Sequence, residues 1–425
     1  MEINKIVNEK LGESYYKIDH DSGLTIYVMP KEGYKSAYAV FGTKYGSIDT
    51  MFRLEGEKEF TKVPEGIAHF LEHKLFESED LDAFELYAKT GADANAYTSF
   101  DRTCYIFNCT GDFKASLKIL LDFVQSPYFT DKTVQKEQGI IGQEIKMTND
   151  SPSWALLFNL LECLYHNHPV KIEIAGTVES IAKIDANLLY KCYETFYSLS
   201  NMTLCVAGNV TVEDVMEVAD PLLKKGTQKK IERTFPDEPD TIVCELKEAS
   251  LPVATPLFSI GFKEKMSAPQ RTLKEEIAAR ILMEILCGDT SEIYRDMFNE
   301  KLINDKFEYE YFCGHGFSLC MFSGESNNTQ EVKNRLIKRI EEVRKNGIDK
   351  TEFARALKTI YGATVMSFND VDELANGLAE AHFTNSGFFD TFEILKNITV
   401  EDIESTLEYA LKPEACAVSI INPVM

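Results

Sequence analysis

The pattern of hydrophobic and polar positions predicts strands that alternate with helices along the chain. Residues 24–28 and 38–42 are short runs rich in aliphatic and aromatic residues, as in buried strands. Residues 64–76 and 82–90 carry apolar residues at helical spacing. Over 97–109 the chain alternates in the manner of a strand and is rich in β-branched and aromatic residues, so we expect another strand there.

Helical periodicity dominates the next part of the sequence. We expect helices at about 112–126, 131–147, 153–164 and 178–198, then a strand at 202–208 and a helix at 212–225. Thr211 is the predicted N-cap of the last helix, because a threonine hydroxyl can accept a hydrogen bond from the first helical turn.

A charged stretch that contains two prolines, Pro236 and Pro239, divides the chain. Such composition is typical of a connection between domains. We therefore predict one domain over 1–226, a linker over 227–240 and a second domain over 241–425. A length of 425 residues is sufficient for two domains.

The second half weakly repeats the first. Asp131-Lys-Thr is followed by Met147 and by Asn149-Asp150, and Asp349-Lys-Thr is followed by Met366 and by Asn369-Asp370. Order and spacing agree within two residues, as a diverged duplication would leave them. We therefore expect two α/β halves of similar topology, each with helices on one face of its sheet.

Composition narrows the class of protein. Hydrophobic residues make up 44% and aromatic residues 11% of the chain, which is ample for large cores. A formal net charge of −23 argues against nucleic acid as a partner, since nucleic acid requires basic surfaces. The chain has no long apolar run and no signal-peptide-like start, so we expect no membrane span and a cytoplasmic protein. The ten cysteines form no Cys-x-x-Cys pair and are predicted to be buried thiols.

The most informative motif is His69-Phe-Leu-Glu72-His73. Two histidines four apart lie on one face of a helix and can bind one metal ion. Glu72 is close enough to act on a metal-bound water, and His-x-x-Glu-His is a known zinc-peptidase signature. With seven histidines in the chain, a chance match is expected on the order of once in a hundred such sequences.

A surface or core histidine pair is the alternative interpretation of this motif. The flanking Ile67, Phe70 and Leu71 form an apolar face that would bury the helix. Because buried histidine and glutamate without partners are costly, a metal explains them better than a core does. A zinc site needs a third protein ligand, and Glu137 and Glu144 lie two helical turns apart on one stripe of the helix predicted at 131–147.

With these residues the chain resembles the pitrilysin/insulinase-type zinc metallopeptidases. It is most similar to their short two-domain branch, which is related to the mitochondrial processing peptidases. The likeness extends over nearly the whole chain. It is carried by the His-x-x-Glu-His motif with its lead-in from Val63, by the stretches 91–103 and 197–208, and by Glu144, 71 residues after His73. The resemblance implies an α+β fold of two homologous α/β sandwich halves, each with a mainly antiparallel sheet.

The resemblance also implies roles for single residues. His69, His73 and Glu144 would hold one zinc ion per chain, Glu72 would be the catalytic general base, and Glu137 would support the ligands. The backbone around Asn95, Ala96 and Thr98 would be the strand edge that binds the substrate, although this stretch could equally be an ordinary hairpin. His166 and His168 also have metal-compatible spacing, but no third ligand stands nearby and we expect them to be structural.

One departure from the family concerns its second half, where members usually carry an arginine and a tyrosine seven residues apart. Asn299 and Lys306 stand at those positions here, and Arg295 and Tyr309 are out of register. The branch often forms dimers, including heterodimers whose second subunit lacks the metal and carries the Arg/Tyr pair. We therefore expect a dimer in which this chain is the metal-bearing subunit.

The expected function is a zinc-dependent endopeptidase that cleaves peptides or small unfolded polypeptides. The acidic charge would favour a basic peptide by steering, although it also serves solubility. Two alternatives remain open at this point: a catalytically silent or scaffold subunit of the same fold, and a dedicated maturation protease for one co-encoded peptide.

Overall fold

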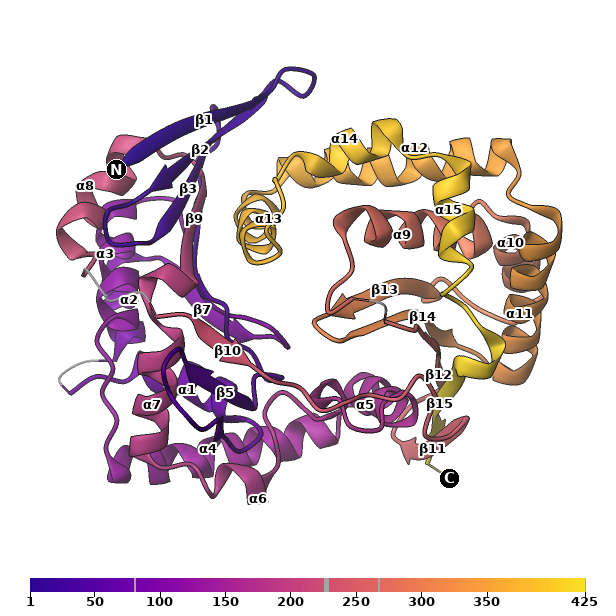
Figure 1. Ribbon diagram of the computed structural model, residues 1–425, viewed down its shortest axis with the longest axis horizontal. Coiled ribbons are helices and arrows are strands. Elements are labelled where there is room, and N and C mark those ends of the chain that lie inside the picture. Colours follow the sequence, from indigo (N-terminus) through magenta and orange to yellow (C-terminus); the bar gives the residue numbers. More distant parts are fainter. Residues whose placement is uncertain (80–81, 225–228, 267, 425) are drawn as a thin grey trace. The chain divides into compact units, whose positions relative to one another are not determined.

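The computed structural model describes residues 1–79, 82–224, 229–266 and 268–424, and these form two compact units (Figure 1). Unit 1 comprises Met1–Ile145, Glu173–Thr234 and Met366–Phe389, and unit 2 comprises Lys146–Ile172, Phe235–Val365 and Asp390–Met425. None of the described helices is long and apolar enough to cross a membrane.

Unit 1 is built on a sheet with the described strand order β1-β2-β3-β9-β4-β8-β7. β3 pairs with β9 in parallel, and the other neighbours in this sheet are antiparallel. A small second sheet has the order β10-β5-β6. The strands of unit 1 are β1 (Glu2–Asn8), β2 (Glu13–Asp19), β3 (Thr25–Pro30), β4 (Ala37–Thr43), β5 (Met51–Leu54), β6 (Thr61–Lys62), β7 (Asp93–Thr98), β8 (Thr103–Cys109), β9 (Met202–Gly208) and β10 (Ile231–Arg233).

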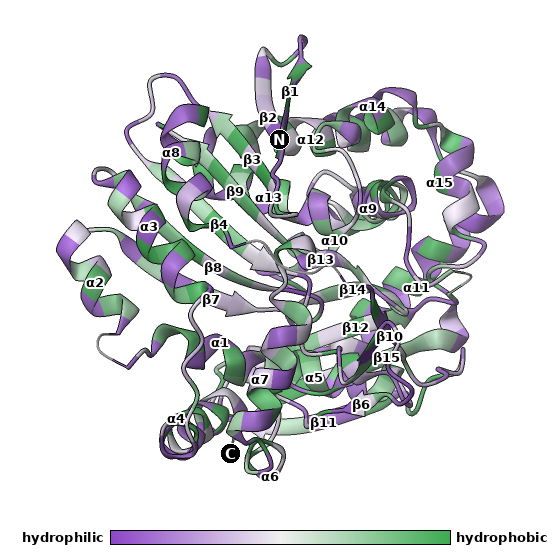
Figure 2. Ribbon diagram, turned by 60° about the vertical axis from the view of Figure 1, so that its left-hand side comes forward, coloured by the Kyte–Doolittle hydropathy of each residue, from purple (hydrophilic) through white to green (hydrophobic). Residues whose placement is uncertain are grey.

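The hydrophobic pattern explains why β4 and β9 lie at the centre of this sheet. Every residue of β9 is buried, as is all of β4 except Tyr38, so both strands are covered on both faces. The central strands are correspondingly coloured as hydrophobic in Figure 2. At the two edges, β1 is largely exposed and β7 is mostly half-buried.

Helices cover one face of the sheet and bury their apolar residues in a common core with the strands. These helices all belong to the first half of the chain. They are α1 (Ile67–Phe76), α2 (Ala83–Thr90), α3 (Phe113–Val124), α4 (Asp131–Asn149), α6 (Val178–Ile181), α7 (Ala186–Phe196) and α8 (Val212–Leu222). Thr211 caps α8 through a capping box with Asp214, which confirms it as the N-cap.

Unit 2 repeats the plan with the strand order β11-β15-β12-β14-β13 among its described strands. Its strands are β11 (Leu246–Leu251), β12 (Leu257–Lys263), β13 (Glu308–Gly314), β14 (Phe317–Glu325) and β15 (Cys416–Pro423). The apolar side chains of these strands form a common core with helices of the second half of the chain. These are α9 (Leu273–Cys287), α10 (Glu292–Asn299), α11 (Thr329–Asn346), α12 (Lys350–Met366), α14 (Asp390–Asn397) and α15 (Val400–Thr406).

The two sheets share one topology. In the main sheet of unit 1, the strands from β3 onward lie side by side in the order β3-β9-β4-β8-β7. Numbered by their place in the chain, these are the first, fifth, second, fourth and third strands. The described strands of unit 2, β11-β15-β12-β14-β13, have the same arrangement. In each unit the first and fifth strands are parallel and the other pairs antiparallel. The expected fold of two homologous halves, each with a mainly antiparallel sheet, is therefore confirmed.

Each sheet also carries, on its other face, a helix from the opposite half of the chain. α13 (Val371–Phe383) packs on β4 and β9 of unit 1, where Phe383 contacts Gly42 and His382 contacts Tyr27. α5 (Pro152–Leu164) packs on β12 and β15 of unit 2, where Leu160 contacts Gly261. The helices follow α12 and α4 respectively, so they occupy equivalent places in the repeat.

This exchange places residues 366–389 in unit 1 and residues 146–172 in unit 2, which differs from the expected division into 1–226 and 241–425. Part of the expected linker 227–240 lies outside the described residues, and part of it is the strand β10. Farther along it, the Glu238 carboxylate accepts hydrogen bonds from the backbone amides of His166, Asn167 and His168.

Two expected elements are divided in the structure. The strand expected at 97–109 is a hairpin of β7 and β8, because Ser99 and Arg102 close a turn between them. The helix expected at 178–198 is interrupted between α6 and α7, where Asp185 caps a new helix. The hairpin of β1 and β2 was not expected, since its exposed first strand lacks a hydrophobic face.

Candidate metal centre

Helix α1 carries the histidine motif, and close packing and backbone conformation restrict the residue that precedes it. Gly66 precedes it with a φ of 87°, a region that favours glycine. A β-carbon at Gly66 would lie 2.3 Å from the carbonyl oxygen of Ala175. The Ser180 hydroxyl donates a 2.8 Å hydrogen bond to the Glu65 carbonyl from the same neighbouring segment. The start of the helix is thus fixed by residues more than a hundred positions later.

Helix packing orients the polar side chains of α1 and α4 toward each other. Phe70, Leu71 and Leu75 are buried in the core of unit 1, which leaves the two histidines on another side of α1. Helix α4 buries Val134, Ile141 and Ile145 in the same core. Glu137 and Glu144, two turns apart, face α1 from this helix.

The side chains of His69, His73 and Glu144 converge. The Nε2 atom of His69 lies 3.4 Å from Glu144 Oε1, and the Nε2 atom of His73 lies 3.4 Å from Glu144 Oε2. The ligand atoms of the three residues all lie within 4.8 Å of one another. Among the described residues, this is the cluster of three or more histidine, cysteine or acidic side chains that could hold a metal ion.

These separations fit a tetrahedral zinc site. Zinc bonds to histidine nitrogen and carboxylate oxygen are about 2.1 Å long, so neighbouring donors in a tetrahedron are about 3.4 Å apart. Each histidine nitrogen lies at this distance from a different oxygen of the Glu144 carboxylate, and one ligand atom from each of the three residues lies within 4.8 Å of the others, so the three side chains can approach one ion. Two neutral imidazoles and one carboxylate are also a donor set of catalytic zinc sites, which keep the fourth position open.

Glu137 orients one of the histidines. Its Oε1 atom lies 3.1 Å from Nδ1 of His73, and its side chain is buried. A proton on Nδ1 would be donated to this carboxylate, which leaves the lone pair of Nε2 available to bind a metal ion. Nδ1 of His69 is buried and has no hydrogen-bond partner in the described part of the chain.

The electrostatics of the cluster favour a cation. Burial disfavours a charged His73, but the hydrogen bond with Glu137 and the charges of Glu72 and Glu144 outweigh it and raise its pKa. The hydrogen bond with His69 lowers the pKa of Glu144, helped by the charges of both histidines and opposed by burial. Several carboxylates around two imidazoles thus stabilise positive charge at this point.

Glu72 is held by a hydroxyl of the neighbouring sheet. The Thr98 hydroxyl donates a 2.6 Å hydrogen bond to Oε2 of the buried Glu72. Thr98 also lies 3.4 Å from the hydroxyl of Thr103, which donates to the Tyr45 carbonyl. A short chain of hydroxyls therefore joins the motif helix to β7 and β8.

Strand β7, which contains Asn95, Ala96 and Thr98, lies at the edge of the main sheet of unit 1. In the described sheet it pairs with β8 alone. The backbone amide of Ala96 donates to Oδ1 of Asn95 rather than to a strand, so this amide faces the open edge. An extended peptide could pair with this edge directly beside Thr98 and Glu72.

Among the described residues, the equivalent place in unit 2 has no such donor set. There Glu284 of α9 accepts a hydrogen bond from the Tyr309 hydroxyl of the edge strand β13, just as Glu72 accepts one from Thr98. Burial raises the pKa of Glu284. No histidine cluster accompanies Glu284 among the described residues, so only unit 1 has a candidate metal site.

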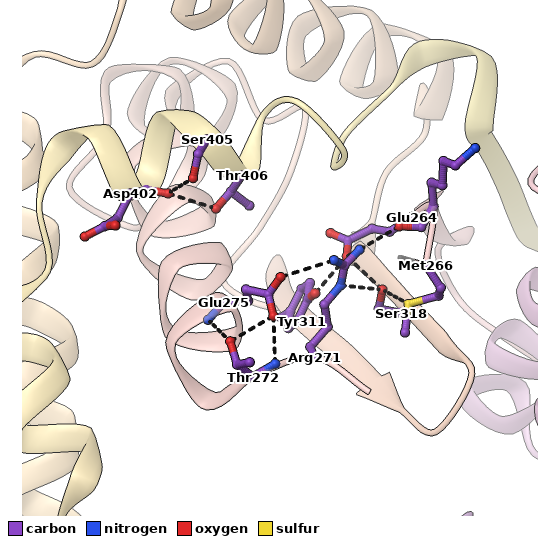
Figure 3. Close-up of polar contacts among 11 residues, drawn as sticks. Glu264, Met266, Arg271, Thr272, Glu275, Tyr311, Ser318, Asp402, Ser405 and Thr406 are labelled. Carbon is purple, nitrogen blue, oxygen red and sulfur yellow. Dashed lines mark hydrogen bonds and ion pairs between the residues drawn. The ribbon is translucent and has the colours of Figure 1, made fainter. Parts of the chain in front are cut away.

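A different polar cluster stabilises the interior of unit 2, and Figure 3 shows it. The guanidinium of Arg271 lies 3.2 Å from the carboxylate of Glu264, and both side chains are almost fully buried. The hydroxyls of Tyr311 and Ser318 each donate a 2.7 Å hydrogen bond to the same carboxylate oxygen. The cation here is a built-in arginine, which makes this cluster structural.

The two positions that depart from the family pattern lie on the surface of unit 2. Asn299 is the exposed last residue of α10. Lys306 pairs with Glu325 at 2.7 Å, and its side chain is 67% exposed. The hydroxyl of Tyr309 binds Glu284, and Nε of Arg295 donates to the carbonyl of Ser291 in its own helix.

The second histidine pair has structural contacts. His168 is buried, accepts a hydrogen bond from the Val170 amide and lies 2.9 Å from the His315 carbonyl. His166 lies 3.3 Å from the Thr241 hydroxyl. Neither belongs to a metal-compatible cluster of the described residues.

Sequence reasoning did not identify two features of this site. Thr98 was expected to contribute backbone to a substrate edge, and its side-chain bond to Glu72 was not expected. Lys74 follows the motif and is fully buried, with its ammonium group bound to Glu77. A lysine one residue after the motif carries no periodic signal of burial. Gly66 falls inside the helix expected at 64–76, whereas α1 begins at Ile67 with Gly66 as its N-cap.

Comparison with known proteins agrees with this geometry. Residues 58–178 match the family model described as insulinase (peptidase family M16), and residues 183–360 match the peptidase M16 inactive domain. The uncharacterized zinc protease YmfH of Bacillus subtilis (strain 168) is 39% identical over 430 residues, which cover 99% of each chain.

Solved structures share the fold over the full length. A putative M16-like peptidase from Alicyclobacillus acidocaldarius is 34% identical with a TM-score of 0.92 and covers 100% of this chain and 99% of its own. A protease from Helicobacter pylori has a TM-score of 0.81 at 19% identity and covers 97% of this chain and 100% of its own, which shows the fold. The resemblance inferred from the motifs is thereby confirmed, and the chain belongs to the insulinase family of zinc peptidases, peptidase family M16.

Proposed function

We propose that this protein is a zinc-dependent endopeptidase that cleaves peptides or small unfolded polypeptides. One observation carries the proposal: His69, His73 and Glu144 bring their donor atoms within 4.8 Å of one another, with Glu72 on the same helix as the histidines. Relatives named zinc proteases support the choice of metal.

Each residue of the cluster has a distinct part in this chemistry. His69, His73 and Glu144 would hold the ion, and Glu137 keeps the imidazole of His73 in one orientation. A zinc ion in such a site supplies a Lewis acid that activates water and polarises a carbonyl group. Glu72, which accepts a hydrogen bond from Thr98, would take the proton of the attacking water and pass it to the leaving amine.

The substrate would bind as an additional strand at the edge of β7. Pairing there exchanges the hydrogen bond between the Ala96 amide and Asn95 for one to the peptide backbone. Backbone pairing is tolerant of sequence, which suits a peptidase that acts on varied extended chains. The net charge of −23 would attract basic peptides in particular.

The subunit arrangement is part of the proposal. Asn299 cannot supply a cationic group to a developing oxyanion, and Lys306 is already paired with Glu325. We therefore propose that a second, metal-free homologue with the Arg/Tyr pair completes the site in a heterodimer.

Metal content and turnover together test the peptidase assignment. We expect about one zinc per chain, lost on His73→Ala or Glu144→Ala. Glu72→Gln should keep its zinc and lose at least about a hundredfold in kcat, because Glu72 is the base and not a ligand. Glu65→Gln, on the loop before α1, is a matched control that should keep both zinc and turnover.

Two results would contradict the assignment. Undiminished peptidase activity in Glu72→Gln would remove its role as base. Purified protein without zinc and without affinity for it would instead indicate a catalytically silent subunit of the same fold.

A further inference from the structure

Two cysteines that are 81 positions apart in sequence meet at the end of helix α5 in unit 2. The Sγ atom of Cys244 lies 3.2 Å from the Sγ atom of Cys163. Cys163 is the penultimate residue of α5 and is buried, whereas Cys244 lies just before β11 and is exposed. The pair therefore has one thiol that a reagent can reach and one that only its neighbour can reach.

The surrounding contacts hold the two thiols in place. The backbone amides of Val243 and Cys244 both donate to the carbonyl of Cys163, at 2.7 and 3.3 Å. Next to the two cysteines, the ammonium group of Lys247 in β11 pairs with the carboxylate of Glu162 in α5. Backbone and ion-pair contacts thus fix the segment 243–247 against α5, independently of the thiols.

We propose that Cys163 and Cys244 are a redox modification site that forms an intramolecular disulfide with low-molecular-weight disulfides as the oxidant. Both cysteines belong to unit 2, whereas the metal cluster belongs to unit 1, so this site does not depend on the proposed peptidase activity.

The reaction proceeds by two thiol–disulfide exchanges. The thiolate of Cys244 attacks one sulfur of the oxidant R–S–S–R, the S–S bond breaks, and one RSH leaves after taking up the proton lost by Cys244. Cys163 then attacks Sγ of Cys244, its own proton passes to the leaving thiolate, and the second RSH is released. The protein loses two protons and two electrons, and the oxidant is reduced to two thiols.

The environment sets the order of these steps. Burial and the adjacent Cys244 raise the pKa of the Cys163 thiol to about 12, so Cys163 is a poor first nucleophile. The exposed Cys244 therefore reacts first, and its mixed disulfide is resolved by the neighbour at contact distance.

The disulfide would tie together segments that lie on either side of the expected linker. It would fix α5, contributed by the first half of the chain, to the start of the second-half sheet. A cross-link that closes so long a loop removes many conformations from the unfolded chain. Oxidation should therefore raise the midpoint of thermal unfolding by about 5 °C.

The test uses the full chain and oxidised glutathione as the probe. Thiols are counted after denaturation, and the digested protein is examined by mass spectrometry for linked peptides. The wild type should lose two of its ten free thiols and give one cross-linked peptide that contains Cys163 and Cys244. The variant Cys244→Ser should lose none of its remaining thiols and show no thermal shift.

Cys313→Ser replaces a half-buried cysteine of unit 2 and should behave as the wild type does. The proposal is overturned if both thiols of the treated wild type remain alkylable, or if Cys244 retains glutathione without linking to Cys163. An equal loss of thiols in Cys244→Ser would also overturn it, because the reacting pair would then lie elsewhere.

Discussion

Thr98 joins the edge strand to the proposed general base through its hydroxyl, which donates to Glu72 at 2.6 Å. Removal of this donor should let the carboxylate rotate away from the attacking water. We predict that Thr98→Val, which keeps the side-chain shape, lowers kcat about tenfold and leaves zinc content and KM nearly unchanged. Steady-state kinetics with a fluorogenic peptide and a zinc assay on the same sample measure this.

Thr98→Ser retains the hydroxyl and should recover most of the turnover. If Thr98→Val instead raises KM with kcat unchanged, the residue acts in substrate binding and not on Glu72.

Helical spacing paired residues within each helix, because i, i+4 and i, i+7 positions share a helix face, whereas the union of Glu144 with the two histidines was implied by the family resemblance. His69 with His73, and Glu137 with Glu144, needed only that geometry. The bond between Thr98 and Glu72 spans 26 positions and depends on how a strand lies beside a helix. No periodic pattern encodes such a contact. Thr98 was expected only as part of the substrate-binding strand edge that the family resemblance implies.

Helix α1 depends on the backbone before it. Gly66 has a φ of 87°, and a β-carbon there would lie 2.3 Å from the Ala175 carbonyl oxygen. We predict that Gly66→Ala costs about 2 kcal/mol or more in the free energy of unfolding and also weakens zinc binding, because it displaces the start of the motif helix. Urea unfolding and a zinc titration measure the two effects.

Gly91 provides the matched control, since its φ is 71° but no atom lies within 4 Å of a β-carbon at this position. Gly91→Ala should cost only about 1 kcal/mol and leave zinc affinity unchanged. Equal effects of both substitutions on zinc affinity would show that the contact with Ala175 does not position the motif.

His168, the N-cap of the 3-10 turn Pro169–Lys171 that follows α5, resists protonation. Burial lowers the pKa of His168 from its ordinary value near 6.5 to about 4. A histidine whose pKa is lowered by folding stabilises the native state fully above its unfolded pKa and progressively less as the pH falls. We predict that about 3 kcal/mol of stability is lost between pH 6.5 and 4 through this residue.

Denaturant unfolding at pH 7 and pH 4 measures this loss, and His168→Gln should make the stability less dependent on pH. His166→Gln, two residues earlier and half-buried, is the control and should keep the wild-type pH dependence. An unchanged pH dependence in His168→Gln would assign the acid sensitivity to other groups.

Helices and strands were predicted most accurately where an uninterrupted stretch of sequence forms a single helix or strand. β9, α5 and α8 occur close to the expected bounds, because each has an uninterrupted pattern. The stretch 97–109 proved to be two strands, since the alternation continues on both sides of a four-residue turn. Local periodicity likewise does not reveal which sheet a helix covers, and so α13 could not be placed in unit 1.

The whole molecule is proposed to need a partner for full activity. The groups nearest the expected Arg/Tyr positions are engaged in unit 2: Lys306 with Glu325, and Tyr309 with Glu284. We predict that the isolated chain cleaves flexible peptides at least about a hundredfold more slowly than a mixture with a co-encoded homologue that has the pair and lacks the zinc motif.

The assay compares the chain alone, the homologue alone and the mixture at equal total protein. The homologue alone should be inactive, and the mixture should lose its activity when this chain carries Glu72→Gln. If the chain alone is as fast as the mixture, the proposal of a shared site is wrong.

The reciprocal placement of α5 and α13 has a consequence for how the molecule can be divided. The arrangement is that of a domain-swapped dimer whose two chains have been fused into one. A fragment that ends at residue 224 would leave one side of β4 and β9 bare, and a fragment that starts at 229 would leave bare the side of β12 that α5 covers. Neither fragment contains all the elements of its own unit. A chain split there should therefore regain its fold only when the two fragments associate.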